Sequence, residues 1–120
     1  MELIATGEAA LPLIVDNNFI LDAVLQCISI RRENYVLTID VEFSQERKNV
    51  PSRFKISLHD VSEYGFYHRQ DFSFDIGEYK MMKCVDGRFY LSLDPSNQED
   101  IPSDGDQDFI FSNNISVFSM

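Results

Sequence analysis

The period-two pattern of residues 35–43, YVLTIDVEF, constrains the fold more than any other feature of the chain. One set of alternate positions is wholly apolar or aromatic and holds Tyr35, Leu37, Ile39, Val41 and Phe43. The other set contains Val36, Thr38, Asp40 and Glu42. Because successive side chains of a strand point to opposite faces of a sheet, the pattern predicts a strand with one face on a core and the other largely in water.

The segment before this strand predicts its hairpin partner. Residues 19–30, FILDAVLQCISI, are apolar or β-branched at most positions, and the polar residues 31–34 separate them from the alternating run. Apolar residues on both faces are typical of a buried strand. We therefore expect a hairpin whose first strand is the more buried of the two.

The segment after it, RFKISLH at 53–59, alternates again, with Phe54, Ile56 and Leu58 on the inward parity. The next apolar residue, Val61, falls on the other parity. A bulge or bend near His59 and Asp60 would absorb this change of phase. A shorter run at 72–76 places Phe72, Phe74 and Ile76 on one parity and predicts another strand.

A second hairpin is predicted at Asp86-Gly87, which separates two apolar runs. Asp-Gly supplies the positive φ angles of a type I′ turn, so strands are expected near 79–85 and 88–93. Phe89, Leu91 and Leu93 would then face the core. The last residues are expected to form two short strand-like runs around Asn113-Asn114, which would hold the preceding acidic loop at both ends.

The fold class follows from these runs and from the scarcity of helical patterns. Residues 2–10 and 96–100 are the segments that could each form a turn or two of helix. A chain of 120 residues with ten Phe and five Tyr is long and apolar enough for one core. We expect residues 1–120 to form a single mainly β domain, an antiparallel β-sandwich or a curved sheet or half-barrel, with at most one or two short helical turns.

Charge is concentrated in one part of the chain. The formal net charge is −10, and the part from residue 94 onward has six acids and no Lys, Arg or His: Asp94, Glu99, Asp100, Asp104, Asp106 and Asp108. We call residues 94–108 the acidic loop. Such a field repels phosphate backbones and anionic membranes, so direct binding to nucleic acid or to a membrane is not expected, whereas a basic protein partner would be attracted.

The compartment is predicted from the N-terminus and the cysteines. Glu2 and Glu8 occupy the region where a secretory signal would carry bases, and no run approaches the ~20 apolar residues that span a bilayer. Cys27 and Cys84 lie in apolar, strand-like surroundings, which favours buried reduced thiols over a disulfide. We therefore expect a cytoplasmic protein.

The acidic loop does not match a dedicated metal site. Counted from Asp104, an EF-hand would need glycine at Phe109 and glutamate at Ile115; counted from Asp100, Gly105 fits but Phe111 stands at the glutamate position. His59 and His68 have no zinc or catalytic spacing around them, and the glycines form no phosphate-binding loop. The sequence predicts no dedicated catalytic, metal or cofactor site, and the loop is solvated, the contact surface for a partner, or an irregular and weak calcium site.

An aromatic segment is the second candidate contact surface. Residues 63–74 hold more aromatic side chains than one strand face can bury. Aromatic residues beside an arginine and an acidic rim are typical of protein interfaces, although a core with a tyrosine edge is the alternative. The residues proposed for the contact are Tyr64, Phe66, Tyr67, His68 and Arg69.

The order of the segments resembles a known kind of protein. FILDAVLQCISIRRENYVLTIDVEF, then PSRFKISLHDVSEYGFY, then an acidic hairpin, is similar over residues 19–94 to small bacterial β-rich immunity proteins encoded beside polymorphic toxins. Asp22, residues 35–43 and the step Asp60-Val61 carry the resemblance. It implies a cytoplasmic inhibitor that binds one toxin and performs no chemistry. A module that self-assembles through sheet edges and a small-ligand-binding domain are the alternatives.

Overall fold

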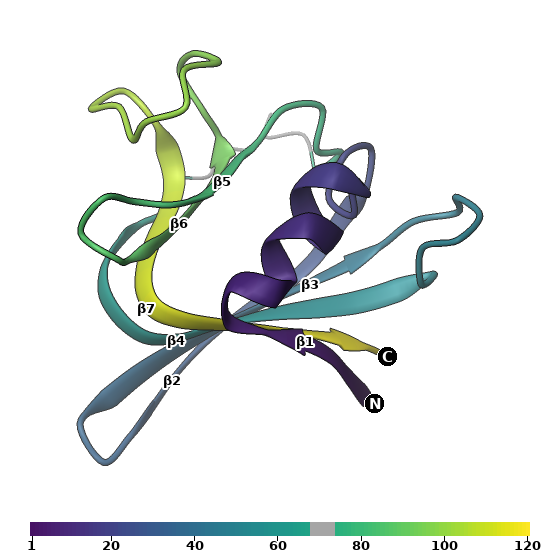
Figure 1. Ribbon diagram of the computed structural model, residues 1–120, viewed down its shortest axis with the longest axis horizontal. Helices are drawn as coiled ribbons and strands as arrows, with labels where there is room; N and C mark the ends of the chain where they lie inside the picture. Colours follow the sequence, from purple (N-terminus) through teal and green to yellow (C-terminus); the bar gives the residue numbers. More distant parts are fainter. Residues whose placement is uncertain (68–73) are drawn as a thin grey trace.

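The computed structural model describes residues 1–67 and 74–120, and these form one open sheet of seven antiparallel strands (Figure 1). Two short helical segments, η1 (Gly7–Ala9) and η2 (Pro12–Asp16), precede most of the sheet. In chain order the strands are β1 (Glu2–Thr6), β2 (Val24–Glu33), β3 (Val36–Ser44), β4 (Arg53–Gly65), β5 (Lys80–Lys83), β6 (Phe89–Asp94) and β7 (Gln107–Ser119). No helix within the described residues is long and apolar enough to cross a membrane.

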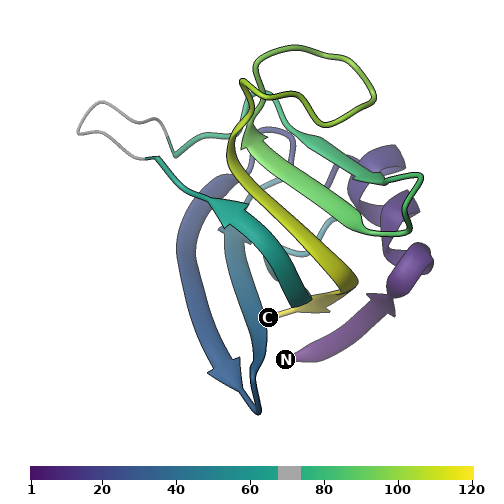
Figure 2. The same cartoon turned by 90° about the vertical axis from the view of Figure 1, so that its left-hand side faces the viewer.

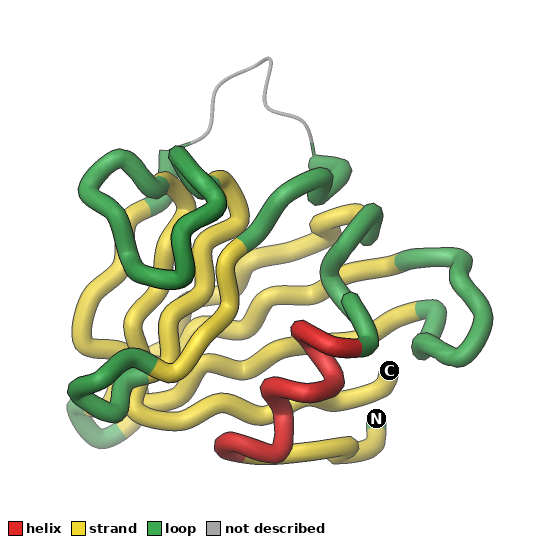
Figure 3. The backbone as a smooth tube through the Cα atoms, turned by 45° about the horizontal axis from the view of Figure 1, so that its top comes forward, coloured by secondary structure: helices red, strands yellow, loops and turns green. Residues whose placement is uncertain are grey.

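The sheet is curved, and its two longest strands, β4 and β7, run through both parts of it and pair with different neighbours along their length. The strand order is β2-β3-β4-β7-β6-β5, and β1 pairs with β7 outside this path. The first half of β7 pairs with β6, and its second half pairs with β1. On its other side β7 pairs with β4 along nearly its whole length. The predicted mainly β fold is confirmed, in its curved-sheet form (Figure 3).

Both shared strands bend at the same place. In β4, Asp60 has a φ of +57°, and the register with β7 shifts between Val61 and Glu63. In β7 the buried parity changes across the exposed pair Asn113 and Asn114. The Asn113 side-chain amide donates to Asp60 Oδ2 at 2.9 Å and thereby joins the two bends. The bend predicted near Asp60 is confirmed, whereas the two predicted C-terminal runs are one bent strand.

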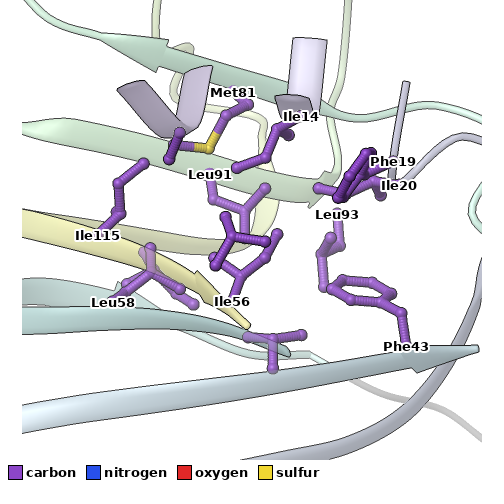
Figure 4. Packing of buried hydrophobic residues seen from close by; sticks show 14 of the residues in the cluster. Ile14, Phe19, Ile20, Phe43, Ile56, Leu58, Met81, Leu91, Leu93 and Ile115 are labelled. Atoms are coloured by element: carbon purple, nitrogen blue, oxygen red, sulfur yellow. The ribbon is translucent and has the colours of Figure 1, made fainter. Parts of the chain in front are cut away.

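The core fills the concave side of the curved sheet. Side chains from β3, β4, β6 and β7 meet the N-terminal segment there, including Ile14 of η2 and Phe19 and Ile20 of the loop that follows (Figure 4). Phe54 is fully buried, stacked on Phe43 with ring centroids 5.0 Å apart. The helical segment crosses the open side of the sheet in Figure 1 and closes the core.

The hairpin of β2 and β3 is confirmed, but two details of the prediction are wrong. The first strand begins at Val24 instead of residue 19, because Asp22 has a φ of +61° and residues 19–23 form a loop, in which Phe19, Ile20 and Ala23 are buried. Strand β2 lies at the edge of the sheet and is mostly exposed, so it is the less buried strand. Apolar residues on both faces of the β2 part of this segment therefore did not indicate a buried strand.

The hairpin of β5 and β6 is also confirmed, with Phe89, Leu91 and Leu93 buried in the core. Its turn is not type I′, because positive φ occurs at Gly87 (+90°) and not at Asp86. Gly87 N donates to Cys84 O at 2.9 Å, and Cys84 N donates to Arg88 O at 2.7 Å. This is the three-residue hairpin loop that ends in a left-handed glycine.

Other local expectations were only partly met. Residues 2–6 form β1 instead of a helical turn, while helical turns do occur at 7–9 and 12–16. Residues 96–100 contain no helix. In the run at 72–76, Ile76 is buried and Phe74 is 52% exposed, and an isolated bridge joins Asp75 to Val24; Phe72 lies outside the described residues. Both cysteines are free, but Cys27 is exposed and Cys84 only half-buried.

Candidate protein-binding surface

The acidic loop folds around a buried ion pair. Asp106 near the end of the loop and Lys80 at the start of β5 are 5% and 4% exposed. Lys80 Nζ lies 3.0 Å from Asp106 Oδ2 and 3.2 Å from Oδ1. The same ammonium donates to the carbonyl of Ile101 at 2.9 Å. One lysine of the sheet therefore holds both the middle and the end of the loop.

Further donors complete the environment of the Asp106 carboxylate. The hydroxyl of Tyr90, on β6, donates to Oδ2 at 2.7 Å. The backbone N–H groups of Ser96 and Ser103 donate at 2.9 and 3.0 Å. A buried charge is tolerated when it is paired and hydrogen-bonded, as it is here. The loop is thus folded onto the outer face of the sheet at its beginning, middle and end.

The pKa of Asp106 reflects this environment. Burial by itself raises the pKa of the carboxyl group, but the hydrogen bonds from Tyr90, Ser96, Ser103 and Lys80 outweigh it and hold the pKa well below its ordinary range. Burial and the bond to Asp106 raise the pKa of the Tyr90 hydroxyl, which keeps that donor protonated. Asp106 is therefore a charged structural anchor and does not offer a contact to a partner, which corrects its place among the predicted contact residues.

Acid titration should reveal this anchor. A depressed folded-state pKa contributes stability that is present above the ordinary aspartate value of about 3.9 and is lost as pH falls through the folded value. We expect the free energy of unfolding, measured by urea titration, to fall steeply below about pH 4. In Asp106→Asn the fall over the same range should be shallower, while Asp104→Asn, at an exposed site, should follow the parent. Equal slopes in all three proteins would contradict the assignment.

Asp108 is also buried, with no exposed surface. Its Oδ1 atom accepts a hydrogen bond of 2.8 Å from the backbone N–H of Tyr67. Asp108 therefore fastens the segment after β4 to the start of β7. The prediction that it contacts a partner is wrong for the same reason as for Asp106: its carboxylate lies inside the protein.

The other predicted acids of the loop lie at the surface. Asp94, Glu99, Asp100 and Asp104 are all exposed. Ile101, between two of them, is 57% exposed. The loop thus presents four carboxylates and one large apolar side chain on a backbone that Asp106 holds in place.

The aromatic segment is partly at the surface as well. Tyr64 and Tyr67 are 42% and 53% exposed, and Phe66 is half-buried. The rings of Tyr64 and Phe66 are in contact, with centroids 5.6 Å apart. His68 and Arg69 lie outside the described residues.

The fold brings the acidic loop and the end of β4 to the same end of the molecule (Figure 2). A pocket of about 270 Å³ lies between them. Its lining comes from β4, β6, β7 and the acidic loop, and consists of Glu63, Tyr90, Pro102, Ser103, Asp104, Asp106, Phe109 and Phe111. Glu63 and Pro102, which are 39 residues apart in the sequence, therefore line one pocket.

Several residues of this surface had no predicted role. Lys80 and Tyr90 were assigned only to a hairpin, and Phe109 and Phe111 only to a C-terminal strand. The signal for Lys80 was a lysine beginning an apolar strand, in the run YKMMKCV at 79–85. Its partner, 26 residues away, could not be identified without the fold.

No cluster of three or more His, Cys, Asp or Glu side chains able to hold a metal occurs among residues 1–67 and 74–120. His59 is exposed, as predicted, and its Nδ1 atom lies 2.8 Å from Thr38 Oγ1. Comparisons of the chain with protein-family models, with curated proteins and with solved structures gave no match. The case for a function therefore depends on the surface described above.

Proposed function

We propose that this protein is a binding domain of the immunity type, which inhibits a basic toxin by covering it with the acidic loop and the neighbouring aromatic surface. The observation that carries the proposal is the anchoring of the loop by Asp106 and Lys80. This anchor fixes four exposed carboxylates before any partner arrives. A preformed surface loses less conformational entropy on binding than a flexible one.

The charge of the surface supports a basic partner. The formal net charge of −10 gives long-range attraction to a cationic protein, which raises association rates. Apolar and aromatic side chains lie beside the acids: Ile101, Tyr64 and Tyr67 are all more than one-third exposed. An apolar centre with a charged rim is the usual composition of a specific interface.

Charge reversal tests the proposal. In a loop variant, Asp94, Glu99 and Asp100 are each changed to Lys; in a control variant with the same change of net charge, the exposed acids Glu2, Glu33 and Glu46 are each changed to Lys. Immobilised parent protein is used to capture its partner from the native cell extract. We expect the loop variant to bind that partner roughly tenfold more weakly, since three exposed ion pairs are worth about 0.5 kcal/mol each.

The control variant distinguishes an effect of where the charges lie from an effect of the net charge alone. It should retain parent affinity within about twofold, because exposed charges away from the contact act only at long range. Circular dichroism and urea unfolding should show that both variants fold. Equal weakening in the two variants would mean that net charge alone matters, and parent affinity in the loop variant would exclude the acidic loop from the interface.

A further inference from the structure

The pocket between the acidic loop and β4 has an aromatic floor. Phe109 and Phe111 flank the fully buried Ile110, so alternation places both rings on the outer face of the sheet. The ring of Tyr90 lies 4.6 Å from that of Phe111, centroid to centroid. Gly65 makes room for the floor, because a Cβ atom there would lie 2.9 Å from Phe109 Cε1.

The walls of the pocket carry negative charge. Glu63 stands on the β4 side and Asp104 on the side of the acidic loop, and both are exposed. The third acid of the lining, Asp106, is already neutralised by Lys80. Within the described lining no basic side chain balances Glu63 or Asp104. A cation in the pocket would therefore meet aromatic faces below it and a carboxylate on either side.

The same aromatic floor already carries a guanidinium at its edge. Arg88 stacks over Phe111 with its Cζ atom 4.2 Å from the ring centroid. Its Nη1 atom donates to Ser62 Oγ at 3.1 Å, and its Nε atom donates to Asp86. A planar guanidinium stacks on an aromatic face and binds carboxylates with a geometry that an ammonium does not have.

We propose that this pocket receives an arginine side chain of the basic partner. The inference rests on the proposed function and names the contact that gives it specificity. A volume of about 270 Å³ is below the ~300–1,000 Å³ typical of small-molecule sites and suits one side chain. Glu63 and Asp104 would pair with the guanidinium while the ring of Phe109 stacks on it, since Arg88 already covers a face of Phe111.

The test uses three capped amino acids as probes. N-acetylarginine methylamide carries the guanidinium, N-acetyllysine methylamide carries a compact charge, and N-acetylcitrulline methylamide has the shape of arginine without its charge. Each is titrated into protein labelled at its phenylalanine rings and followed by NMR. We expect the arginine probe to shift the Phe109 and Phe111 signals saturably, with lysine about two- to fivefold weaker and citrulline weaker still, given the modest strength of exposed cation–π contacts and ion pairs.

Two variants and a control localise the binding. Glu63→Gln and Phe109→Leu should each weaken binding of the arginine probe about two- to fivefold, whereas Glu46→Gln should leave it unchanged. Dispersed spectra of each variant establish that it folds. Absence of saturable shifts at Phe109 and Phe111 would overturn the inference, as would citrulline or lysine binding equal to arginine.

Failure of this inference is distinguishable from failure of the proposed function. The loop variant leaves Glu63 and Asp104 unchanged, so it tests the contact surface without altering the walls of the pocket. Partner capture that depends on Asp94, Glu99 and Asp100, together with no response to the arginine probe, would keep the binding surface and remove only the arginine pocket.

Discussion

Replacing Asp106 with alanine is expected to lower the free energy of unfolding by about 3–5 kcal/mol, the usual loss when one partner of a buried ion pair is removed. The truncation leaves the Lys80 ammonium, which is 4% exposed, without its counter-ion. It also removes the acceptor of the Tyr90 hydroxyl and of the Ser96 and Ser103 amides. Urea unfolding of the parent and the variant at neutral pH gives the difference directly.

A matched control is available in the same loop. Asp104→Ala removes an exposed carboxylate two residues away and should change stability by no more than about 0.5 kcal/mol. The double variant Lys80→Met with Asp106→Leu should lose much less than the sum of the two single losses, because it leaves neither charge buried alone. A loss below about 1 kcal/mol for Asp106→Ala would contradict the role of the pair as an anchor.

Replacing Phe54 with alanine should cost a similar amount, about 3–5 kcal/mol, because truncation of a buried ring leaves a cavity that the core fills only in part. Phe54 has no exposed surface, and it contacts Phe43 and Phe19 with ring centroids 5.0 and 5.4 Å away. Since Phe19 belongs to the segment that closes the concave side, the variant should loosen that segment as well.

Thermal and urea unfolding measure this loss, and Tyr35→Ala provides the comparison. Tyr35 is 91% exposed, so its truncation should change stability by no more than about 0.5 kcal/mol. Hydrogen exchange of the amides of residues 17–23 should become faster in Phe54→Ala and stay unchanged in Tyr35→Ala. A small loss at Phe54 would mean that the concave side of the sheet is not the main core.

Strong alternation was the reliable guide to the fold. Ile39, Val41 and Phe43 of β3 and Phe54, Ile56 and Leu58 of β4 are all buried, because a strand with one face on the core leaves a period-two pattern. The phase change before Val61 located the bend of β4 correctly. Asp-Gly located the second hairpin but not its turn type, since a glycine with positive φ serves both kinds of loop.

The prediction was wrong where burial depends on distant parts of the chain. Strand β2 has apolar residues on both faces, yet its place at the sheet edge leaves most of the strand exposed. Phe19 and Ile20 are buried without belonging to a strand, because their loop closes the open side of the sheet. In both cases the position of the segment in the fold decides whether its side chains are buried, and the local sequence pattern does not reveal that position.

The candidate surface was predicted only in part, again because the burial of a side chain depends on distant parts of the chain. Asp94, Glu99, Asp100 and Asp104 are exposed, as a contact surface requires. Asp106 and Asp108 have the same spacing and chemistry as Asp104, but Asp106 is buried against Lys80 and Tyr90, and Asp108 lies on the buried face of β7. Local sequence does not distinguish the anchor from the contact residues, because the Lys80 partner of Asp106 comes from another hairpin.

The association rate constant of the captured partner, measured at increasing ionic strength, tests the central proposal most directly. For the parent and the control variant we expect association to slow steeply as salt screens the acidic loop. For the variant with Asp94, Glu99 and Asp100 changed to Lys, association should already be slow at low salt and should depend much less on ionic strength. Equal rates and equal salt dependence in all three proteins would contradict the proposal that the acidic loop is the contact surface for a basic partner.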